Sequence, residues 1–266
     1  MVRLLHMPRI CRASLNVLLI LAAGVGWPAP PGHAAEAASL WQREELVAWC
    51  IVPYDAKKRD APARAAMLER LHVHKLAYDW RAEHVAAFDT EVTTMAQHGI
   101  ELVAWWFPTK LDDTARRILE VIERHKIHPQ LWVTGGGALT KNDTEQSERI
   151  ASEVARLRPI VGEAARLGCK VGLYNHGGWF GEPENQLAVL ARLRAGGATN
   201  VGLVYNFHHG HDHLERFAKL WPQMQSAVLA VNLNGMVAGG DQLGKQIHYL
   251  GDGDHELALI DRKSVV

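Results

Sequence analysis

Histidine is concentrated in one short segment in the second half of the chain, residues 205–213, where four histidines fall within six positions. Imidazole binds divalent cations and transfers protons near neutral pH. We therefore predict His208, His209 and His211 as metal ligands, and His209 also as a catalytic residue. The alternative is that the later part of the segment, residues 211–213, caps the next helix and faces solvent.

A second segment, residues 174–185, combines a histidine with paired glycines, a tryptophan and two glutamates. We predict His176 as a catalytic acid or base, because imidazole is the side chain most often used for that purpose. Trp179 offers a flat face for stacking on a sugar, and Glu182 is predicted to bind substrate. Glu182 precedes Pro183, so a role at the start of a helix is the alternative.

Further polar and aromatic residues fall where apolar, strand-like runs end. A polar group in such a place costs a few kcal/mol, of order 1–3, unless it is paired or used. The asparagines after three successive runs are therefore the strongest indication of a binding site. The predicted substrate-binding residues of this kind are Asp79, Arg81, Trp106, Asn175, Asn206, Asn232 and Asn234.

The elements that must position these residues alternate along the chain as short apolar runs and amphipathic segments. Strands are predicted at residues 46–52, 73–78, 100–107, 130–134, 170–175, 200–206 and 227–233. Helices are predicted at residues 61–71, 83–97, 112–126, 144–167, 183–195 and 213–225, with another beginning near Asp254. This pattern favours a parallel sheet of the α/β class, and the number of units favours a (β/α)8 TIM barrel. The strand ends of such a barrel meet at one face, where active sites lie.

The eighth strand of the barrel is missing from this pattern. The residues after Asp254 leave no room for a helix followed by another strand. Because an unpaired barrel edge would expose strand backbone, we favour a barrel cut short before its eighth strand over a natively open one.

The first 37 residues are predicted to lie outside the barrel, which occupies residues 38–266. Three arginines precede an apolar run, followed by prolines and small residues, which is the order of regions in a secretory signal peptide. The apolar run is shorter than the roughly 20 residues of a membrane-spanning helix, so cleavage is favoured over anchoring. We expect an exported protein, periplasmic or extracellular, without a membrane association after cleavage.

The amino-acid composition restricts the classes of molecule that the protein is expected to bind. The 266 residues carry 29 basic and 29 acidic side chains, so no net field attracts a polyanion, and nucleic acid is not expected as a partner. The 15 His and 9 Trp favour a small-molecule site. Cys50 and Cys169 each fall beside a predicted strand and are expected to be packed thiols, not a disulfide or a metal pair. The sequence leaves the oligomeric state open.

Four segments carry a resemblance to a known family: residues 76–81, residues 173–178, residues 200–206 with His209 behind them, and residues 229–235. Through these segments the chain resembles the sugar phosphate isomerase/epimerase group of the xylose isomerase-like TIM barrels. The resemblance implies a carbohydrate substrate and one divalent metal (Mn, Mg, Co or Zn). In the family Glu, Asp, His and Glu from the fifth to eighth strands hold that metal, and the two Glu move the substrate proton.

This chain departs from the family at those positions. Tyr174 stands at the first Glu position, Asn206 at the Asp position and Asn232 at the His position, whereas His209 matches a site histidine of the family. Amides and a phenol bring no negative charge, so they hold a hard cation less tightly than carboxylates do. They also provide no base for removing a proton next to a carbonyl.

Two functions follow as hypotheses. The first is an isomerase, epimerase or lyase that acts on a sugar or keto-sugar with an atypical site, by metal-assisted proton transfer. The alternative is an exported carbohydrate-binding barrel without catalysis. A role as an AP endonuclease, an activity found in the same superfamily, is disfavoured because a carboxylate-rich metal cluster and a basic DNA surface are both missing from the sequence.

Overall fold

A computed structural model describes residues 43–244 and 247–248 of the chain. The predicted signal peptide, residues 1–37, and the helix expected near Asp254 lie outside the described residues. No helix within the described part is long and apolar enough to cross a membrane.

Seven parallel strands form one sheet whose spatial order is the order of the sequence. The strands are β1 (Val47–Ala48), β2 (Lys75–Tyr78), β3 (Glu101–Phe107), β4 (Gln130–Val133), β5 (Lys170–Tyr174), β6 (Val201–Asn206) and β7 (Val228–Asn232). The α-helices are α1 (Ala61–Leu71), α2 (Phe88–Gln97), α3 (Asp113–His125), α4 (Asp143–Arg166), α5 (Gly178–Gly181), α6 (Pro183–Ala195) and α7 (Phe217–Met224).

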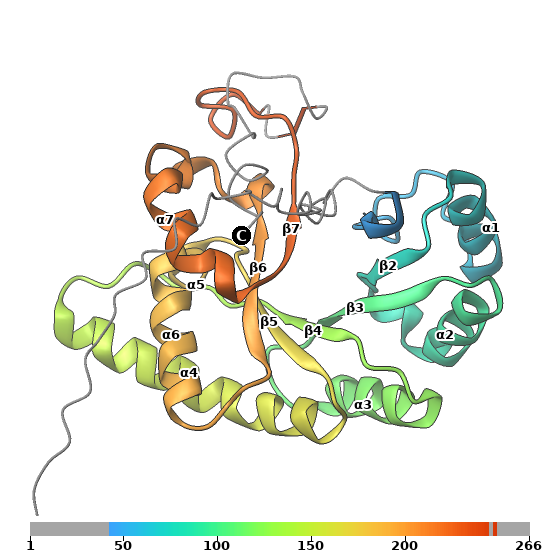
Figure 1. Cartoon of the computed structure of the whole chain (residues 1–266), viewed down its shortest axis with the longest axis horizontal. Helices are drawn as coiled ribbons and strands as arrows, with labels where there is room; N and C mark the ends of the chain where they lie inside the picture. Colours follow the sequence, from blue (N-terminus) through green and yellow to red (C-terminus); the bar gives the residue numbers. More distant parts are fainter. Residues whose placement is uncertain (1–42, 245–246, 249–266) are drawn as a thin grey trace, which may run out of the picture. The chain divides into compact units, whose positions relative to one another are not determined.

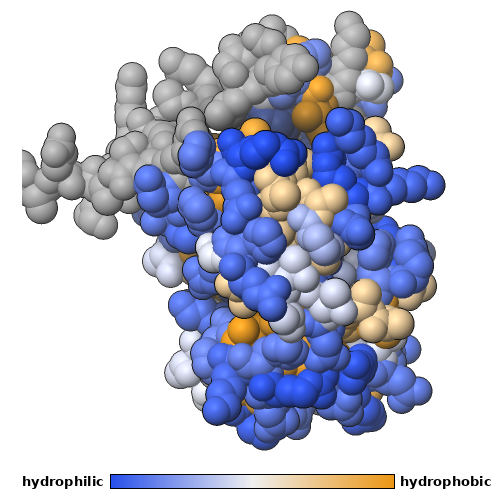
Figure 2. All heavy atoms as spheres, turned by 90° about the vertical axis from the view of Figure 1, so that its right-hand side faces the viewer, coloured by the Kyte–Doolittle hydropathy of each residue, from blue (hydrophilic) through white to orange (hydrophobic). Residues whose placement is uncertain are grey.

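The sheet is curled into a half-barrel, with the helices along its outer side (Figure 1). In that view α1 and α2 lie beside β2, and α6 and α7 lie beside β6. The described residues hold no eighth strand after β7. The predicted α/β barrel with seven strands is therefore confirmed. The surface on the side of α1 and α2 is largely hydrophilic, as expected for the outer faces of the helix layer (Figure 2).

The helices begin where the sequence places capping residues. The Asp60 carboxylate accepts a hydrogen bond from the backbone N–H of Ala63 at 3.0 Å, and Asn142 does the same for Glu145 at 2.9 Å. Such caps satisfy backbone donors that have no partner in the first turn of a helix. The starts of α1 and α4 consequently fall within one residue of their predicted positions.

The structure corrects two parts of the sequence prediction, the length of the first strand and the type of helix at two helix starts. The first strand was expected over residues 46–52 but spans only Val47–Ala48, because Cys50 has a φ of 55°, in the left-handed region that ends a strand. The helices expected from residues 83 and 213 begin as 3-10 helices, Ala82–Ala87 and His211–Arg216, before α2 and α7 continue them. The other short 3-10 helices are Arg43–Glu45, Phe207–His209 and Gln225–Ala227.

Alternation along the strands divides the apolar side chains between two layers. On β4, Leu131 and Val133 belong to the large core between sheet and helices, whereas Trp132 between them belongs to a separate inner cluster. The same alternation on β5 sends Val171 and Leu173 outward to the helices and Tyr174 inward. The outer layer holds the fold together, and the inner layer forms the floor below the strand ends.

Candidate functional site

Three tryptophans and a tyrosine form the inner layer of the half-barrel. The ring centroid of Trp132 lies 4.2 Å from that of Trp49, 4.7 Å from Trp106 and 6.1 Å from Tyr174, with the last pair nearly parallel at 7°. Trp132 and Tyr174 are buried, while Trp49 and Trp106 are half-buried. The two half-buried indoles therefore present aromatic surface to the interior of the half-barrel. We call these four residues the aromatic floor.

Neighbouring strands make room for the floor by placing glycines beside the large rings. Trp106 on β3 pairs with Trp132 on β4, which pairs with Gly172 on β5, which in turn pairs with Gly202 on β6. A Cβ atom at Gly172 would lie 2.5 Å from Cγ2 of Val204 and 2.8 Å from Cδ1 of Trp132. Only glycine fits there, because the indole lies directly against the backbone of β5.

Asn175 and Asn206 tie the ends of β5 and β6 together. The backbone N–H of Asn206 donates to Oδ1 of Asn175 at 2.7 Å, and Nδ2 of Asn175 donates to the Asn206 carbonyl at 3.1 Å. Nδ2 of Asn206 donates to Oη of Tyr174 at 2.7 Å. Asn175 is fully buried and Asn206 is 4% exposed. Both amides thus shape the strand ends, and substrate binding by Asn175 and Asn206 stays a prediction.

Above the floor stand the two histidines predicted as catalytic. The ring centroids of His176 and His209 are 4.3 Å apart, and they lie 5.8 Å and 5.9 Å from the ring of Tyr174. His176, after β5, is exposed and His209, after β6, is half-buried. Burial, and then the nearby His176 and His208, lower the pKa of His209 from 6.5 to about 4. His209 is therefore a neutral imidazole at pH 7, able to accept a proton.

The residues present do not fit a hard divalent cation. Asn206 turns its amide N–H toward Tyr174, and burial above all raises the pKa of the Tyr174 phenol, so neither group offers an anionic oxygen. His208 lies beside His209, with 4.5 Å between ring centroids. Nevertheless, the described residues contain no group of three or more His, Cys, Asp or Glu side chains arranged to hold a metal. The predicted ligands His208, His209 and His211 do not come together as such a group.

Asp79 occupies the end of β2 as a buried carboxyl group. It is 2% exposed, its Oδ1 accepts the backbone N–H of Val52 at 3.4 Å, and its Oδ2 is buried without a hydrogen-bond partner. Burial is the main cause that raises the pKa of Asp79 from 3.8 to about 7. Arg81 is exposed, and its guanidinium donates to the backbone carbonyls of Asp79 and Trp80 at 2.9 Å and 2.8 Å.

Two residues predicted to bind substrate are engaged elsewhere. Trp179 is 1% exposed, its Nε1 donates to Gln146 at 2.7 Å, and the Arg149 guanidinium covers its ring at 5.6 Å. Its stacking on a sugar was therefore the wrong expectation, because neither face is free. Glu182 pairs with Arg216, and its Oε1 lies 3.6 Å from Nε2 of His213. These two partners lower the pKa of Glu182 to about 2.

The histidine segment divides into two parts. His213 is 3% exposed and its Nδ1 lies 3.1 Å from Oη of Tyr205, so it supports the loop from the helix side and does not face solvent as the sequence suggested. His208 and His209 remain at the strand end.

The two asparagines predicted to bind substrate at the end of β7 differ in exposure. Asn232, the last residue of β7, lies in register with Asn206 and is half-buried. Asn234, just after β7, is buried, and its Nδ2 donates to the Gly235 carbonyl at 3.0 Å.

Sequence reasoning missed Trp49 and Trp132. The period-two alternation of β4 was the available signal for Trp132, since it is flanked by two residues of the outer core. Trp49 follows a strand too short for that alternation to show. Trp106, which was predicted to line the pocket, does lie on the inner layer.

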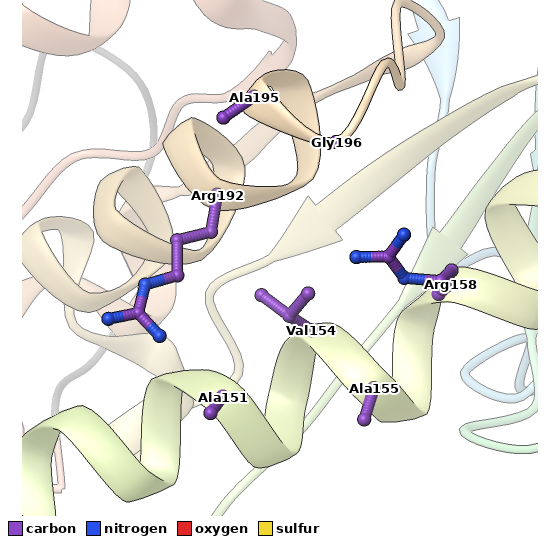
Figure 3. A pocket seen from close by; sticks show the side chains of 7 residues that line it. All are labelled: Ala151, Val154, Ala155, Arg158, Arg192, Ala195 and Gly196. Carbon is purple, nitrogen blue, oxygen red and sulfur yellow. The ribbon is translucent and has the colours of Figure 1, made fainter.

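A separate groove lies in the helix layer, away from the strand ends. It is a cavity of about 480 Å³ between α4 and α6, into which Arg158 and Arg192 reach from opposite helices (Figure 3). Small residues of both helices also line it, among them Ala151 and Ala155 on α4 and Ala195 on α6. Since it is outside the sheet, it shares no residue with the floor or the histidine pair.

Comparisons with known proteins place the fold. No known family profile and no curated protein matches the chain. Among solved structures, protein SMc04130 of Sinorhizobium meliloti 1021 is similar with a TM-score of 0.61 and 15% identity, covering 84% of this chain and 85% of that one.

Two further solved structures carry a named activity. The probable 3-DHS dehydratase AsbF of Bacillus anthracis, involved in petrobactin synthesis, has a TM-score of 0.55 and 12% identity over 72% of this chain and 73% of its own. The 3-keto-D-glucoside 4-epimerase YcjR of E. coli has a TM-score of 0.52 and 12% identity over 82% and 95%. These likenesses show a shared fold.

Proposed function

Starting from the xylose isomerase-like TIM-barrel fold that the chain shares with these proteins, we propose that it binds a sugar or keto-sugar at the strand ends and transfers protons on it. The reaction class is isomerisation, epimerisation or elimination. The observation that carries this proposal is the His176–His209 pair, with ring centroids 4.3 Å apart, standing over an aromatic floor. The 3-keto-D-glucoside 4-epimerase activity of YcjR and the dehydratase activity of AsbF fall in these reaction classes and support the proposal.

The floor supplies the binding surface. The half-buried indoles of Trp49 and Trp106 meet edge to face, with 5.6 Å between centroids, so one ring can cover the apolar C–H face of a sugar while the other borders it. Asn232 on β7 and Arg81 after β2 are the groups we assign to hydroxyl or anionic substituents, because both are accessible at the same end of the sheet.

The histidines supply the chemistry. A neutral imidazole at His209 takes the proton from a carbon next to a carbonyl, and the electron pair moves onto the carbonyl oxygen to give an enediolate. Returning a proton to the neighbouring carbon gives the isomer, returning it to the same carbon from the other side gives the epimer, and loss of a β-hydroxyl gives elimination. No step is assigned to a metal, because the described residues do not fit one.

Binding without turnover is the second candidate function. It is favoured by Asn206 and Tyr174, which hydrogen-bond to each other at 2.7 Å in positions where the resembled family has carboxylates. Both proposals include export of the protein, which we infer from the signal-peptide pattern of residues 1–37.

The test is deuterium wash-in. Full-length protein is incubated in D2O with a panel of ketoses and keto-glycosides, with EDTA present, and NMR follows replacement of the carbon-bound protons. We expect wash-in by the wild type and a loss of about 100-fold or more in His209→Phe, the scale of general-base catalysis. His72→Phe is the matched control, since His72 is exposed after α1, at the opposite end of the strands.

Three results would decide between the proposals. Wash-in that survives in a His176→Phe/His209→Phe double variant contradicts the assignment of the histidines. Sugar binding by the wild type without wash-in supports the second candidate. If no sugar of the panel binds or exchanges, both candidates are wrong.

A further inference from the structure

Each histidine of the pair is carried by a short loop. His176 belongs to residues 175–182, between β5 and α6, and His209 belongs to residues 207–216, between β6 and α7. We call these segments the His176 loop and the His209 loop. The amides at the ends of β5 and β6 join the two loops where they begin. The separation of the imidazoles also depends on how the loops are held farther along the chain.

An ionic contact joins the same two loops at their far ends. Glu182, the last residue of the His176 loop, pairs with the guanidinium of Arg216, the last residue of the His209 loop. Oε1 of Glu182 also lies 3.6 Å from Nε2 of His213, which is buried. One half-buried carboxylate therefore faces two basic groups of the neighbouring loop. Ion pairs that are partly buried are screened by salt less than exposed pairs are.

His213 is held from both sides. Its Nδ1 lies 3.1 Å from Oη of Tyr205 and its Nε2 faces Glu182, so the ring cannot turn over without losing a partner. The backbone of the His209 loop also rests on Tyr205, because a Cβ atom at Gly210 would lie 2.6 Å from that Oη. His209 directly precedes Gly210, so the position of its ring depends on how this loop is seated.

The Glu182 side chain makes no capping hydrogen bond to α6, although Glu182 is the residue at which that helix begins. A capping bond therefore does not account for the direction of the carboxylate. The contact with His213, and then that with Arg216, outweigh partial burial and lower the pKa of Glu182 to about 2. The carboxylate is consequently ionised near neutral pH, where it attracts both basic groups.

We propose that Glu182 is a positioning residue for the histidine pair, and that it acts through His213 and Arg216 by holding the His209 loop against the His176 loop. The inference rests on the proposed function. In this assignment Glu182 touches no substrate atom, and the role replaces the substrate contact expected of it from the sequence. It sets the separation of the two imidazoles, whose centroids are 4.3 Å apart, and so the place of the base above the aromatic floor.

The expected effect follows from the dependence of proton transfer on geometry. A displacement of about 1 Å at a catalytic group can cost about 100-fold in rate. Loss of the Glu182 contacts should therefore lower kcat by roughly 10- to 100-fold. KM should change by less than about twofold, because the indoles proposed to receive the sugar, Trp49 and Trp106, lie after β1 and on β3.

The first test needs no turnover. NMR measures the NOEs between the ring protons of His176 and His209 in the full-length wild type, in Glu182→Ala and in Glu182→Gln, and urea unfolding shows that each protein is folded. We expect these NOEs in the wild type and their loss in Glu182→Ala. Glu182→Gln keeps an acceptor for Arg216 without the charge, so it should show weaker NOEs than the wild type.

Glu184→Ala is the matched control. Glu184 is exposed in the first turn of α6 and pairs with the same Arg216, but the contact with His213 belongs to Glu182. Exposed ion pairs contribute little to stability. Glu184→Ala should therefore keep the NOEs and the kcat of the wild type.

The second test measures kcat and KM of deuterium wash-in for Glu182→Ala, His213→Asn and the double variant. If Glu182 acts through His213, the double variant should lose less than the product of the two single losses, by about tenfold. Losses that multiply overturn the link through His213.

The two tests separate this inference from the proposed function. Wild-type NOEs together with unchanged wash-in in Glu182→Ala overturn the role of Glu182 and leave the proposed function standing. A fall of kcat with KM unchanged and the NOEs lost supports both. Absence of wash-in from the wild type overturns both.

Discussion

Replacing Asn175 by alanine tests whether the strand ends are held together as the structure shows. The substitution removes the acceptor of the Asn206 N–H, at 2.7 Å, and the donor to the Asn206 carbonyl, at 3.1 Å. Asn175 is fully buried, so water cannot replace these partners. Losing two hydrogen bonds and leaving their backbone partners in a buried place costs about 2–4 kcal/mol.

The assay is urea unfolding followed by tryptophan fluorescence, with the free energy of unfolding extrapolated to water. A loss below about 0.5 kcal/mol in Asn175→Ala would refute the reasoning, since it would mean that water or a rearranged backbone satisfies Asn206.

Three further predictions concern packing and pH. Gly172→Ala should lower the free energy of unfolding in urea by about 1–3 kcal/mol and alter the near-ultraviolet circular dichroism, because the added Cβ meets Val204 and Trp132. Gly162→Ala on α4 is the control and should change neither, because no atom outside its own stretch of helix lies within 4 Å of its added Cβ. In the folded protein the pKa of His209 is lowered from 6.5 to about 4. As the pH decreases from 6.5 to 4, the unfolded chain therefore binds a proton at this residue before the folded protein does, and the free energy of unfolding decreases. In urea titrations, His209→Gln should make that decrease smaller. The pKa of Asp79 is raised from 3.8 to about 7, so the free energy of unfolding decreases as the pH rises from 3.8 toward 7. Asp79→Asn should reduce this dependence on pH. A variant with the same pH dependence as the wild type would contradict the claim that burial raises the pKa of Asp79.

The order of the elements was predictable because each depends on local signals. The capping residues Asp60 and Asn142 mark helix starts, and the apolar runs between helices can only be buried strands of a parallel sheet. The short β1 was not predictable, because its end depends on the left-handed backbone of Cys50, which no pattern of residue types announces.

The site was predictable only in part, and the reason is again physical. His176 and His209 follow neighbouring strands, so the fold brings them together. Trp179 fell in the same polar segment but is held in the core by Gln146 and Arg149, which approach from α4. A contact from another helix leaves no trace in the local sequence.

The central claim is that the histidine pair over the aromatic floor receives a keto-sugar. Its most direct test is an NMR titration of the imidazole ring signals with the ketoses and keto-glycosides of the panel. The account predicts that the signals of His176 and His209 shift together and saturate. Those of His72 and His128, exposed before the first residues of β2 and β4 at the opposite end of the strands, stay in place. Saturable binding that leaves the His176 and His209 signals unmoved would contradict it.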